Sequence, residues 1–261
     1  MCRLLLIIGE NYDKNIIYNF LNQSIIKKNT PNINSCRDID FHKDGFGLSW
    51  KYQDRYVIYK NHKCYTEDKN INKIIDNIPK NILIGHIRAR CPNLQANVKY
   101  ENTHPFKFKE NIWLHNGCIN NFELFKKNNE NKILNKFKTN IKRNTDSEFL
   151  FYLFLSLYNK KNNQTINSLI ETNINFFTIL KKYKNSISAN IIYSNDKYIF
   201  ISRYINNKDI APSLYYNTDR NNIIISSEPL IEKYNIFPNN HCFIIDINLK
   251  KIIIDLKLSK I

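Results

Sequence analysis

The sequence predicts an α+β fold, with strands towards both ends of the chain and the main helices in the middle. Short apolar runs typical of strands dominate the first 120 residues and the last third, whereas apolar side chains recur at helical spacing between positions 146 and 182. This order favours a layered α+β protein over a repeated βαβ unit. With 261 residues, 43% of them hydrophobic, and no proline- or glycine-rich linker, we expect a single domain over residues 1–261, with Met1 removed.

The first half of the chain is expected to supply several strands and one helix. The apolar run over residues 2–8 predicts a buried strand, and the spacing of apolar side chains predicts a helix over residues 16–25. Residues 46–52 and 55–60 are predicted to form a hairpin, because Gln53-Asp54 between them is typical of a turn. Two more short buried strands are expected at residues 82–87 and 112–115.

The second half is expected to begin with two long helices and then return to strands. Residues 146–157 are predicted to form the first helix, with Thr145 and Glu148 as a capping box at its start. Residues 165–182 are predicted to form the second. The remaining strands are expected at residues 188–193, 198–204, 223–226, 242–247 and 251–256.

The composition and charge indicate which partners the protein could bind and where in the cell it is expected. A net charge of +16 suggests nucleic-acid binding. The lysines are, however, dispersed among Asn and Ile, and we interpret them as solvated surface, with binding to a polyanion as the alternative. The Asn- and Lys-rich residues 126–144 and 159–163 are interpreted as surface insertions. No apolar run approaches the ~20 residues of a membrane span, and the start lacks a secretory signal, so we expect a cytoplasmic protein without membrane contact.

The cysteines are scattered and include no CxxC pair, which argues against a zinc ribbon or a thioredoxin-type site. We expect these thiols to be reduced, and we expect neither a metal nor a cofactor. The six are Cys2, Cys36, Cys64, Cys91, Cys118 and Cys242.

Cys2 stands directly after the initiator methionine. Aminopeptidases remove a methionine that precedes a small residue, so the mature chain is expected to begin with this cysteine. Its α-amine, with an ordinary pKa near ~8, and its thiol, near ~8.5, both titrate close to neutrality. The amine can therefore act as the base that activates the side chain of the same residue. The alternative is an ordinary cysteine at the start of a buried strand.

Three further segments carry the residue types that an amide-cleaving thiolate needs. Asn116 and the backbone N–H of Gly117 can form an oxyanion hole. Arg88 can bind a carboxylate through two hydrogen bonds, and Asp146 can bind an ammonium group. Taken singly, Asn116-Gly117 is typical of a hairpin turn, Arg88 of a surface or ion-pair residue, and Asp146 of the first turn of a helix.

Together these segments resemble the class II glutamine amidotransferases, which are N-terminal-nucleophile hydrolases. The resemblance is closest to the stand-alone branch that includes the amidotransferase-like subunit of the cytosolic glutathione-degrading complex. It extends from residue 2 to about residue 240. The matching segments are Cys2, Asp44-Gly45-Phe46-Gly47, Gly85-His86-Ile87-Arg88, Glu101-Asn102-Thr103-His104-Pro105-Phe106, His115-Asn116-Gly117, Thr145-Asp146-Ser147-Glu148, Ser202-Arg203-Tyr204 and Ser226-Ser227-Glu228-Pro229-Leu230.

The resemblance implies a four-layer αββα sandwich with two antiparallel sheets. It also implies that Cys2 is the nucleophile and its α-amine the base. Asn116 and Gly117 would form the oxyanion hole, and Arg88 and Asp146 would bind the substrate α-carboxylate and α-ammonium. His104 would support the pocket. The sequence departs from the family at Ala89-Arg90-Cys91-Pro92, where a small residue and then Thr usually follow the arginine.

The implied reaction is hydrolysis of a γ-glutamyl amide bond, in glutamine or in γ-glutamyl peptides such as glutathione, through a thioester on the N-terminal cysteine. One alternative is a catalytic subunit that delivers ammonia to a separate synthase. Another is a non-enzymatic polyanion-binding protein on the same scaffold. A small-molecule γ-glutamyl substrate is expected, a partner subunit in a hetero-complex is the open alternative to a free enzyme, and nucleic acid is not expected as a ligand despite the charge.

Overall fold

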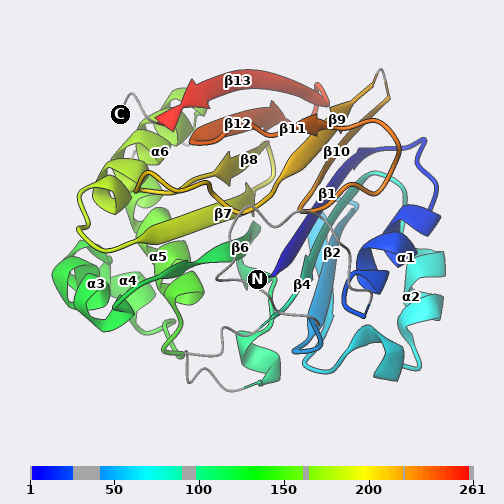
Figure 1. Cartoon of the computed structure of the whole chain (residues 1–261), viewed down its shortest axis with the longest axis horizontal. Coiled ribbons are helices and arrows are strands. Elements are labelled where there is room, and N and C mark those ends of the chain that lie inside the picture. Colours follow the sequence, from blue (N-terminus) through cyan, green and yellow to red (C-terminus); the bar gives the residue numbers. More distant parts are fainter. Residues whose placement is uncertain (1, 26–41, 90–97, 161–164, 220, 259–261) are drawn as a thin grey trace.

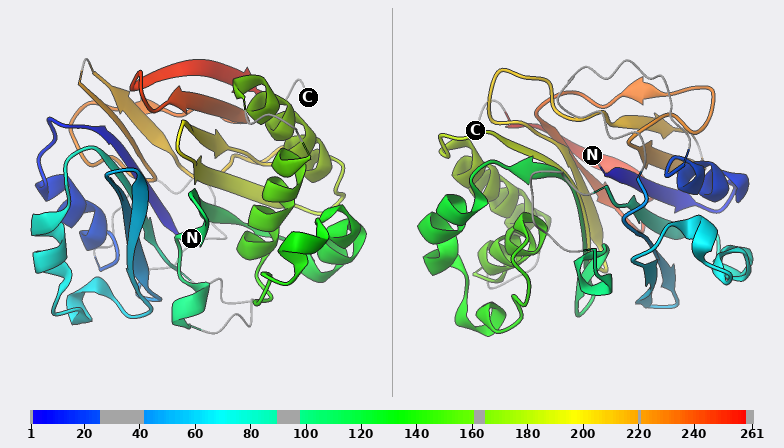
Figure 2. Two further views of the ribbon diagram at one scale, coloured as in Figure 1. Left: turned by 180° about the vertical axis from the view of Figure 1, so that it is seen from behind. Right: turned by 60° about the horizontal axis from the view of Figure 1, so that its bottom comes forward.

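The computed structural model describes residues 2–25, 42–89, 98–160, 165–219 and 221–258. Two antiparallel sheets lie face to face between two layers of helices (Figure 1). Figure 2 shows the same order of layers from two other directions, with the N-terminal helices on one outer side and the central helices on the other. This is the four-layer αββα sandwich that the resemblance implies, so the predicted fold class is confirmed.

The first sheet holds the start of the chain at its centre. Its seven strands have the order β11-β9-β10-β1-β4-β2-β3. Strand β1 (Arg3–Gly9) pairs with β10 (Asn222–Ser226) on one side and with β4 (Ile82–Ile87) on the other. The outer face is covered by α1 (Asn15–Asn22) and α2 (Ile71–Asn77). The other strands are β2 (Phe46–Tyr52), β3 (Arg55–Asn61), β9 (Tyr215–Thr218) and β11 (Asn235–Ile236).

The second sheet has six strands in the order β13-β12-β8-β7-β6-β5. Strand β6 (Asn111–Ile119) pairs from Ile112 to Ile119 with β7 (Ile187–Ser194). On its other side, the short β5 (Phe106–Phe108) pairs only with its first three residues. The other strands are β8 (Tyr198–Arg203), β12 (His241–Asp246) and β13 (Lys251–Lys257).

Helices α5 (Asp146–Asn159) and α6 (Ile166–Lys181) cover the outer face of the second sheet (Figure 1). Two shorter helices, α3 (Phe122–Asn129) and α4 (Asn135–Lys138), lie beside them. Three single-turn 3₁₀ helices occupy Tyr65–Glu67, Tyr100–Asn102 and Glu130–Lys132.

The central strands of the two sheets are buried on both faces, which explains why they are apolar without alternation. In β1, Leu4, Leu6 and Ile8 pack between the two sheets. Leu5 and Ile7 of the same strand pack against the helices α1 and α2. The core under α5 and α6 is rich in aromatic rings, with Trp113 fully buried at its centre.

Several details differ from the sequence predictions. The strand expected at residues 112–115 extends to Ile119, so Asn116-Gly117 lies inside β6 and not in a hairpin turn. Residues 126–144 are not a plain surface insertion, because they contain α4 and bury Ile133 and Phe137 under α5. Only half of the predicted capping box forms, because Thr145 Oγ1 accepts from the Glu148 N–H but the Glu148 carboxylate binds Arg143. Residues 161–163 of the second expected insertion, at 159–163, lie outside the described residues.

Candidate functional site

The sequence-predicted residues from both sheets meet at one end of the space between them. Cys2 immediately precedes β1, and the register pairs Arg3 with Ile87, so Cys2 lies opposite Arg88 at the end of β4. The N–H of Ala89 approaches Cys2 Sγ at 3.5 Å, and Sγ lies 3.6 Å from the Ala89 carbonyl oxygen. Strand β1 also contacts β6 of the other sheet, beside which it starts in Figure 1.

The environment of Cys2 keeps its thiol neutral at rest. Burial raises the pKa of the thiol above its ordinary value, and the carboxylate of Asp146 raises it further. The N–H of Ala89 and the charge of Arg88 act in the opposite direction. Because burial is the largest of these effects, the thiol needs a base to become a nucleophile. The same interactions show that Arg88 and Asp146 lie close enough to Cys2 to affect its ionisation.

Arg88 is buried beside the nucleophile candidate, with only 7% of its surface exposed. Its backbone N–H donates to the Gly45 carbonyl at 2.8 Å, and Nη1 of its guanidinium donates to the Asp44 carbonyl at 3.4 Å. Gly45 has a φ of +118°, a conformation that a residue with a side chain rarely adopts. The glycine-rich segment before β2 therefore places the backbone that positions Arg88. Residues 90–97, which include the departure at Arg90-Cys91-Pro92, lie outside the described residues.

Gly117 allows β6 and β7 to approach closely. A Cβ at this position would lie 1.9 Å from the Ser188 carbonyl oxygen and 2.5 Å from Nε2 of His115. Successive N–H groups of a strand point to opposite edges. The N–H of Cys118 donates to Ser188 of β7, whereas that of Ile119 donates to Asp146 on the other edge. The N–H of Gly117 consequently points to the same edge as that of Ile119, away from β7.

Asn116 points into the space between the sheets. It lies on the same face of β6 as Ile112 and Leu114, because every second side chain of a strand shares a face. Those two residues belong to the core between the sheets. The side chain is 2% exposed, and its Oδ1 is buried without a hydrogen-bond partner among the described residues. Since buried polar atoms are normally paired, this oxygen can accept a hydrogen bond that none of the described residues donates.

Asp146 is the first residue of α5, and its carboxylate joins the helix to β6. Oδ2 accepts from the Ile119 N–H at 3.2 Å, and Oδ1 accepts from the Ser147 N–H at 2.7 Å. Its position in the first turn of α5 also suits the helix dipole. Asp146 therefore does stabilise the helix start, as expected for an acidic residue in a first turn. An ionised carboxylate has about four acceptor sites, which leaves capacity for a ligand.

A stack of neutral rings lies behind these groups. The ring centroids of His86 and His104 are 4.2 Å apart, and those of His104 and Phe106 are 4.3 Å apart. Burial lowers the pKa of His86 to about 3 and that of His104 well below its ordinary value, so both imidazoles are uncharged. His86 Nε2 lies 3.3 Å from the His115 carbonyl oxygen in β6. A Cβ on Gly47 would lie 2.0 Å from the His104 carbonyl oxygen, so two of the sequence segments pack directly on each other.

Sequence reasoning assigned no role to the residues that hold the start of β1. Ser227 Oγ accepts from the Leu4 N–H at 2.9 Å, and the Ser227 N–H donates to the Leu4 carbonyl at 3.0 Å. Arg3 Nη1 lies 3.5 Å from the Cys2 carbonyl, and its Nη2 lies 3.5 Å from the carboxylate of Glu228. The segment Ser226-Ser227-Glu228 was a signal for these residues, but it served only as a family marker.

Glu148 and Arg203 also have structural roles that the motifs alone do not reveal. Glu148 Oε2 accepts from the Arg143 N–H at 2.8 Å and Oε1 from the Arg143 guanidinium at 2.7 Å. Thr145 Oγ1 does accept from the Glu148 N–H, at 3.3 Å, which is the half of the capping box that forms. The guanidinium of Arg203 donates to three backbone carbonyls, those of Ala211, Pro212 and Phe237.

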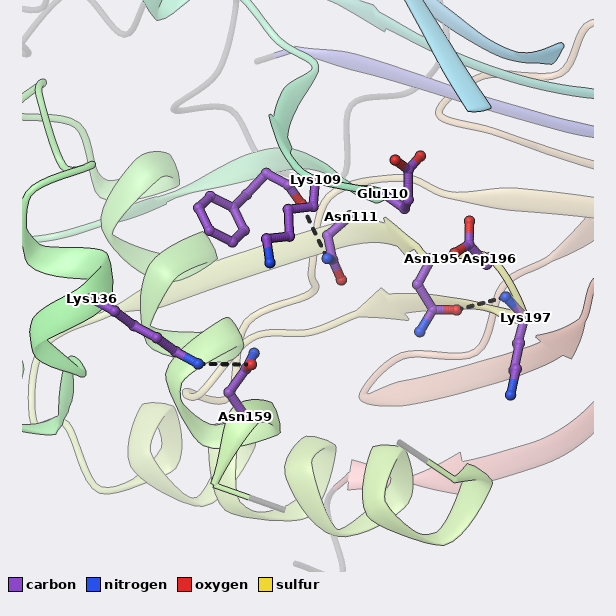
Figure 3. A pocket seen from close by; sticks show the side chains of 9 residues that line it. Lys109, Glu110, Asn111, Lys136, Asn159, Asn195, Asp196 and Lys197 are labelled. Atoms are coloured by element: carbon purple, nitrogen blue, oxygen red, sulfur yellow. Dashed lines mark hydrogen bonds between the residues drawn. The ribbon is translucent and has the colours of Figure 1, made fainter. Parts of the chain in front are cut away.

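A hollow also lies on the second sheet, away from Cys2 and the other candidate site residues. It has a volume of about 320 Å³ and is lined by the turns around β5–β6 and β7–β8 together with α4 and the end of α5 (Figure 3). Lys109, Lys136 and Lys197 line it, and so do Glu110 and Asp196. None of the sequence-predicted site residues contributes to this hollow.

Comparisons with known proteins point to one family. The family described as "Glutamine amidotransferases class-II" matches residues 26–215. A curated relative, the "Probable glutamine amidotransferase DUG3" of Saccharomyces cerevisiae, is 24% identical over 231 residues, which cover 72% of this chain and 64% of the yeast protein. The chain thus spans less than two thirds of the length of that relative.

Solved structures share the fold. A glutamine aminotransferase class-II domain protein from Silicibacter pomeroyi superposes with a TM-score of 0.63 at 20% identity, covering 94% of both chains. The glutamine phosphoribosylpyrophosphate amidotransferase of B. subtilis gives a TM-score of 0.65 at 16% identity, over 99% of this chain and 49% of that one. A predicted glutamine amidotransferase from Pseudomonas aeruginosa gives 0.54 at 14% identity, over 97% and 95% of the two chains. No described helix has the length and apolar character that a membrane crossing requires.

Proposed function

Because the chain belongs to the class-II glutamine amidotransferases, we propose that it hydrolyses γ-glutamyl amide bonds through a thioester on Cys2. One observation carries the proposal. Cys2, Arg88 and Asp146 come from three distant segments, yet strand register sets Cys2 opposite Arg88, and Asp146 is bonded to the Ile119 N–H of β6. Strand β6, which carries Asn116 and Gly117, contacts β1, and its His115 carbonyl oxygen lies 3.3 Å from Nε2 of His86 in β4.

The chemistry begins with removal of Met1, which exposes the α-amine of Cys2. The neutral thiol gives its proton to this amine, and the sulfur attacks the amide carbon. The carbonyl oxygen gains a negative charge, which Asn116 and the N–H of Gly117 stabilise. The C–N bond then breaks, the leaving amine takes the proton, and a γ-glutamyl thioester remains on Cys2. Water attacks the thioester next, releasing glutamate and restoring the thiol.

Arg88 and Asp146 recognise the α-carbon end of the substrate. The guanidinium of Arg88 binds the α-carboxylate, and the remaining acceptor sites of Asp146 bind the α-ammonium. Both groups are held by backbone contacts from other segments, Arg88 by residues 44 and 45 and Asp146 by Ile119. His104 supports the pocket from the ring stack, and because burial lowers its pKa well below the ordinary value, its imidazole is a poor proton acceptor.

The substrate is proposed to be glutamine or a γ-glutamyl peptide such as glutathione. The motif resemblance to the stand-alone branch supports this choice, and the similarity to the yeast DUG3 protein supports the family behind it. An ammonia-delivering subunit of a larger complex is the second candidate, since the matching family is one of amidotransferases. A cytoplasmic location is proposed along with either activity.

The test combines labelling with substrate comparison. Intact-mass spectrometry after incubation with a glutamine-analogue electrophile should show loss of Met1 and a single adduct on Cys2. Glutamate release should then be measured from glutamine and from glutathione. Release from either substrate supports hydrolysis, and the faster one identifies the leaving amine. No adduct at Cys2 and no glutamate from either substrate would refute the proposed function.

A further inference from the structure

A small basic hollow lies where the edges of the two sheets come together. It has a volume of about 190 Å³, and Lys60 of β3, Phe106 and Lys107 of β5, and Arg143 and Glu148 near the start of α5 contribute to its walls. Strands β3 and β5 are the last strands of their sheets. None of the groups proposed above for nucleophilic attack, oxyanion stabilisation or substrate binding lines this hollow.

The hollow carries more positive than negative charge. Glu148 is its one carboxylate among the described lining residues, and both of its oxygens are bound to Arg143. Lys60 Nζ donates instead to the Thr103 carbonyl at 2.8 Å, and Lys107 Nζ donates to the Tyr56 carbonyl at 2.6 Å. The two ammonium groups therefore have neutral hydrogen-bond partners, and neither charge is balanced by the carboxylate in the wall.

Without a bound anion, the hollow holds a partly buried ammonium group close to another cation and a buried guanidinium N–H without an acceptor among the described residues. Burial lowers the pKa of Lys60 to about 8, and the nearby charge of Arg143 contributes to the shift, while Glu101 opposes it. In addition, Nε of Arg143 is buried without a hydrogen-bond partner among the described residues. An oxyanion between the two side chains would relieve the repulsion and accept from unused donors, because guanidinium and ammonium groups bind such oxygens strongly.

We propose that this hollow is a binding site for a small oxyanion, a phosphate or carboxylate group carried by a small molecule, held between Lys60 and Arg143. Both cations are fixed by ring faces, since Lys60 Nζ lies 4.8 Å from the centre of the Tyr100 ring and Arg143 Cζ lies 5.7 Å from that of Phe106. The site therefore has its charges in place before the ligand arrives, which reduces the cost of binding. This proposal does not depend on the hydrolase activity.

The hollow is also connected to the region of the proposed reaction. Phe106 lies in its wall and stacks on His104, which stacks on His86. His86 in turn approaches the carbonyl of His115, the residue before Asn116. A bound anion would therefore sit against the outer end of the ring stack that packs behind Asn116.

The hollow in Figure 3 supplies a matched control. Lys136 there donates to the Asn159 side-chain oxygen at 3.1 Å, and its Nζ lies 5.1 Å from the centre of the Phe137 ring. Like Lys60, it has a neutral acceptor and an aromatic neighbour. Its hollow, however, also includes the carboxylates of Glu110 and Asp196 in the wall, which offset the lysines.

Calorimetric titration of the intact protein tests the site, with inorganic phosphate and succinate as separate probes at constant ionic strength. The wild type should bind at least one of them, and the better probe identifies the type of oxyanion. Lys60→Met should weaken binding by about tenfold or more, because a charge-assisted hydrogen bond is lost. Lys60→Arg should retain binding, and Lys136→Met should bind like the wild type.

Circular dichroism melts would establish that each variant is folded, and Lys60→Gln is the second neutral variant if Lys60→Met does not fold. The proposal is overturned if neither probe binds the wild type at millimolar concentration. Equal weakening by Lys60→Met and Lys136→Met would also overturn it, since that result would reflect only the overall positive charge of the protein.

Discussion

Asn116 offers the sharpest separation of catalysis from stability. Its amide is buried, and its Oδ1 makes no hydrogen bond within the described part of the chain, so Asn116→Ala removes no native acceptor contact. We expect little change in the melting temperature. Loss of one oxyanion donor should nevertheless lower kcat by ~10²–10³-fold with little change in KM.

The matched control is Asn111→Ala in the same strand. The Asn111 Oδ1 accepts from the Tyr193 hydroxyl at 2.6 Å, and its Nδ2 donates to the Phe108 carbonyl at 3.1 Å. Its removal leaves the buried Tyr193 hydroxyl with Asn195 Nδ2 as a donor but without an acceptor for its own proton, and should reduce the free energy of unfolding by about 1–3 kcal/mol, while kcat is retained. Steady-state glutamate release and thermal melts of both variants decide the matter. If Asn116→Ala loses stability as Asn111→Ala does and keeps its kcat, the assignment of Asn116 to the oxyanion hole is wrong.

Four further outcomes are expected. Cys2→Ala should abolish glutamate release without unfolding the protein, and a tenth of wild-type activity would exclude Cys2 as the nucleophile. Arg88→Lys keeps the charge but loses the planar fork, so it should mainly raise KM; an unchanged KM in steady-state kinetics would contradict its role. Gly117→Ala would place a Cβ 1.9 Å from the Ser188 carbonyl oxygen, so its melting temperature should fall clearly below that of the wild type; an unchanged melt would show that β6 and β7 can separate freely. Burial raises the pKa of the Cys2 thiol, so kcat/KM should rise with pH as the α-amine loses its proton near ~8, and a profile already flat at pH 6 would point to another base.

The fold could be predicted in outline because its strongest signals are local. The hairpin of β2 and β3 was visible from its turn, where Gln53 has a φ of +52°. The two long helices were visible from their apolar spacing, and each begins at a threonine whose side chain accepts from the helix. The extent of β6 was not visible, because Asn116 and Gly117 have a poor intrinsic preference for strands. Pairing with β7 from Ile112 to Ile119 overrides that preference.

The partners of individual polar side chains were equally hidden from the sequence. Glu148 was expected to complete a capping box, but its carboxylate binds Arg143 instead. Arg203 was a family marker, and only the folded chain shows that it binds three carbonyls of distant loops. Such contacts depend on segments brought together by the sheets, and sequence spacing contains no record of them.

By itself, the sequence determined the α+β class, the family and the identity of the candidate residues. The class follows from apolar periodicity, the candidate residues from the chemistry of their side chains, and the family from the resemblance of its motif segments; all three are properties of short segments. The tertiary structure alone decided that Cys2 lies opposite Arg88, that Gly117 turns its N–H away from β7, and that Lys60 and Arg143 share a hollow. The reason is physical: strand register and sheet order set which distant residues become neighbours, and both are fixed by burial of the whole core and not by any single segment.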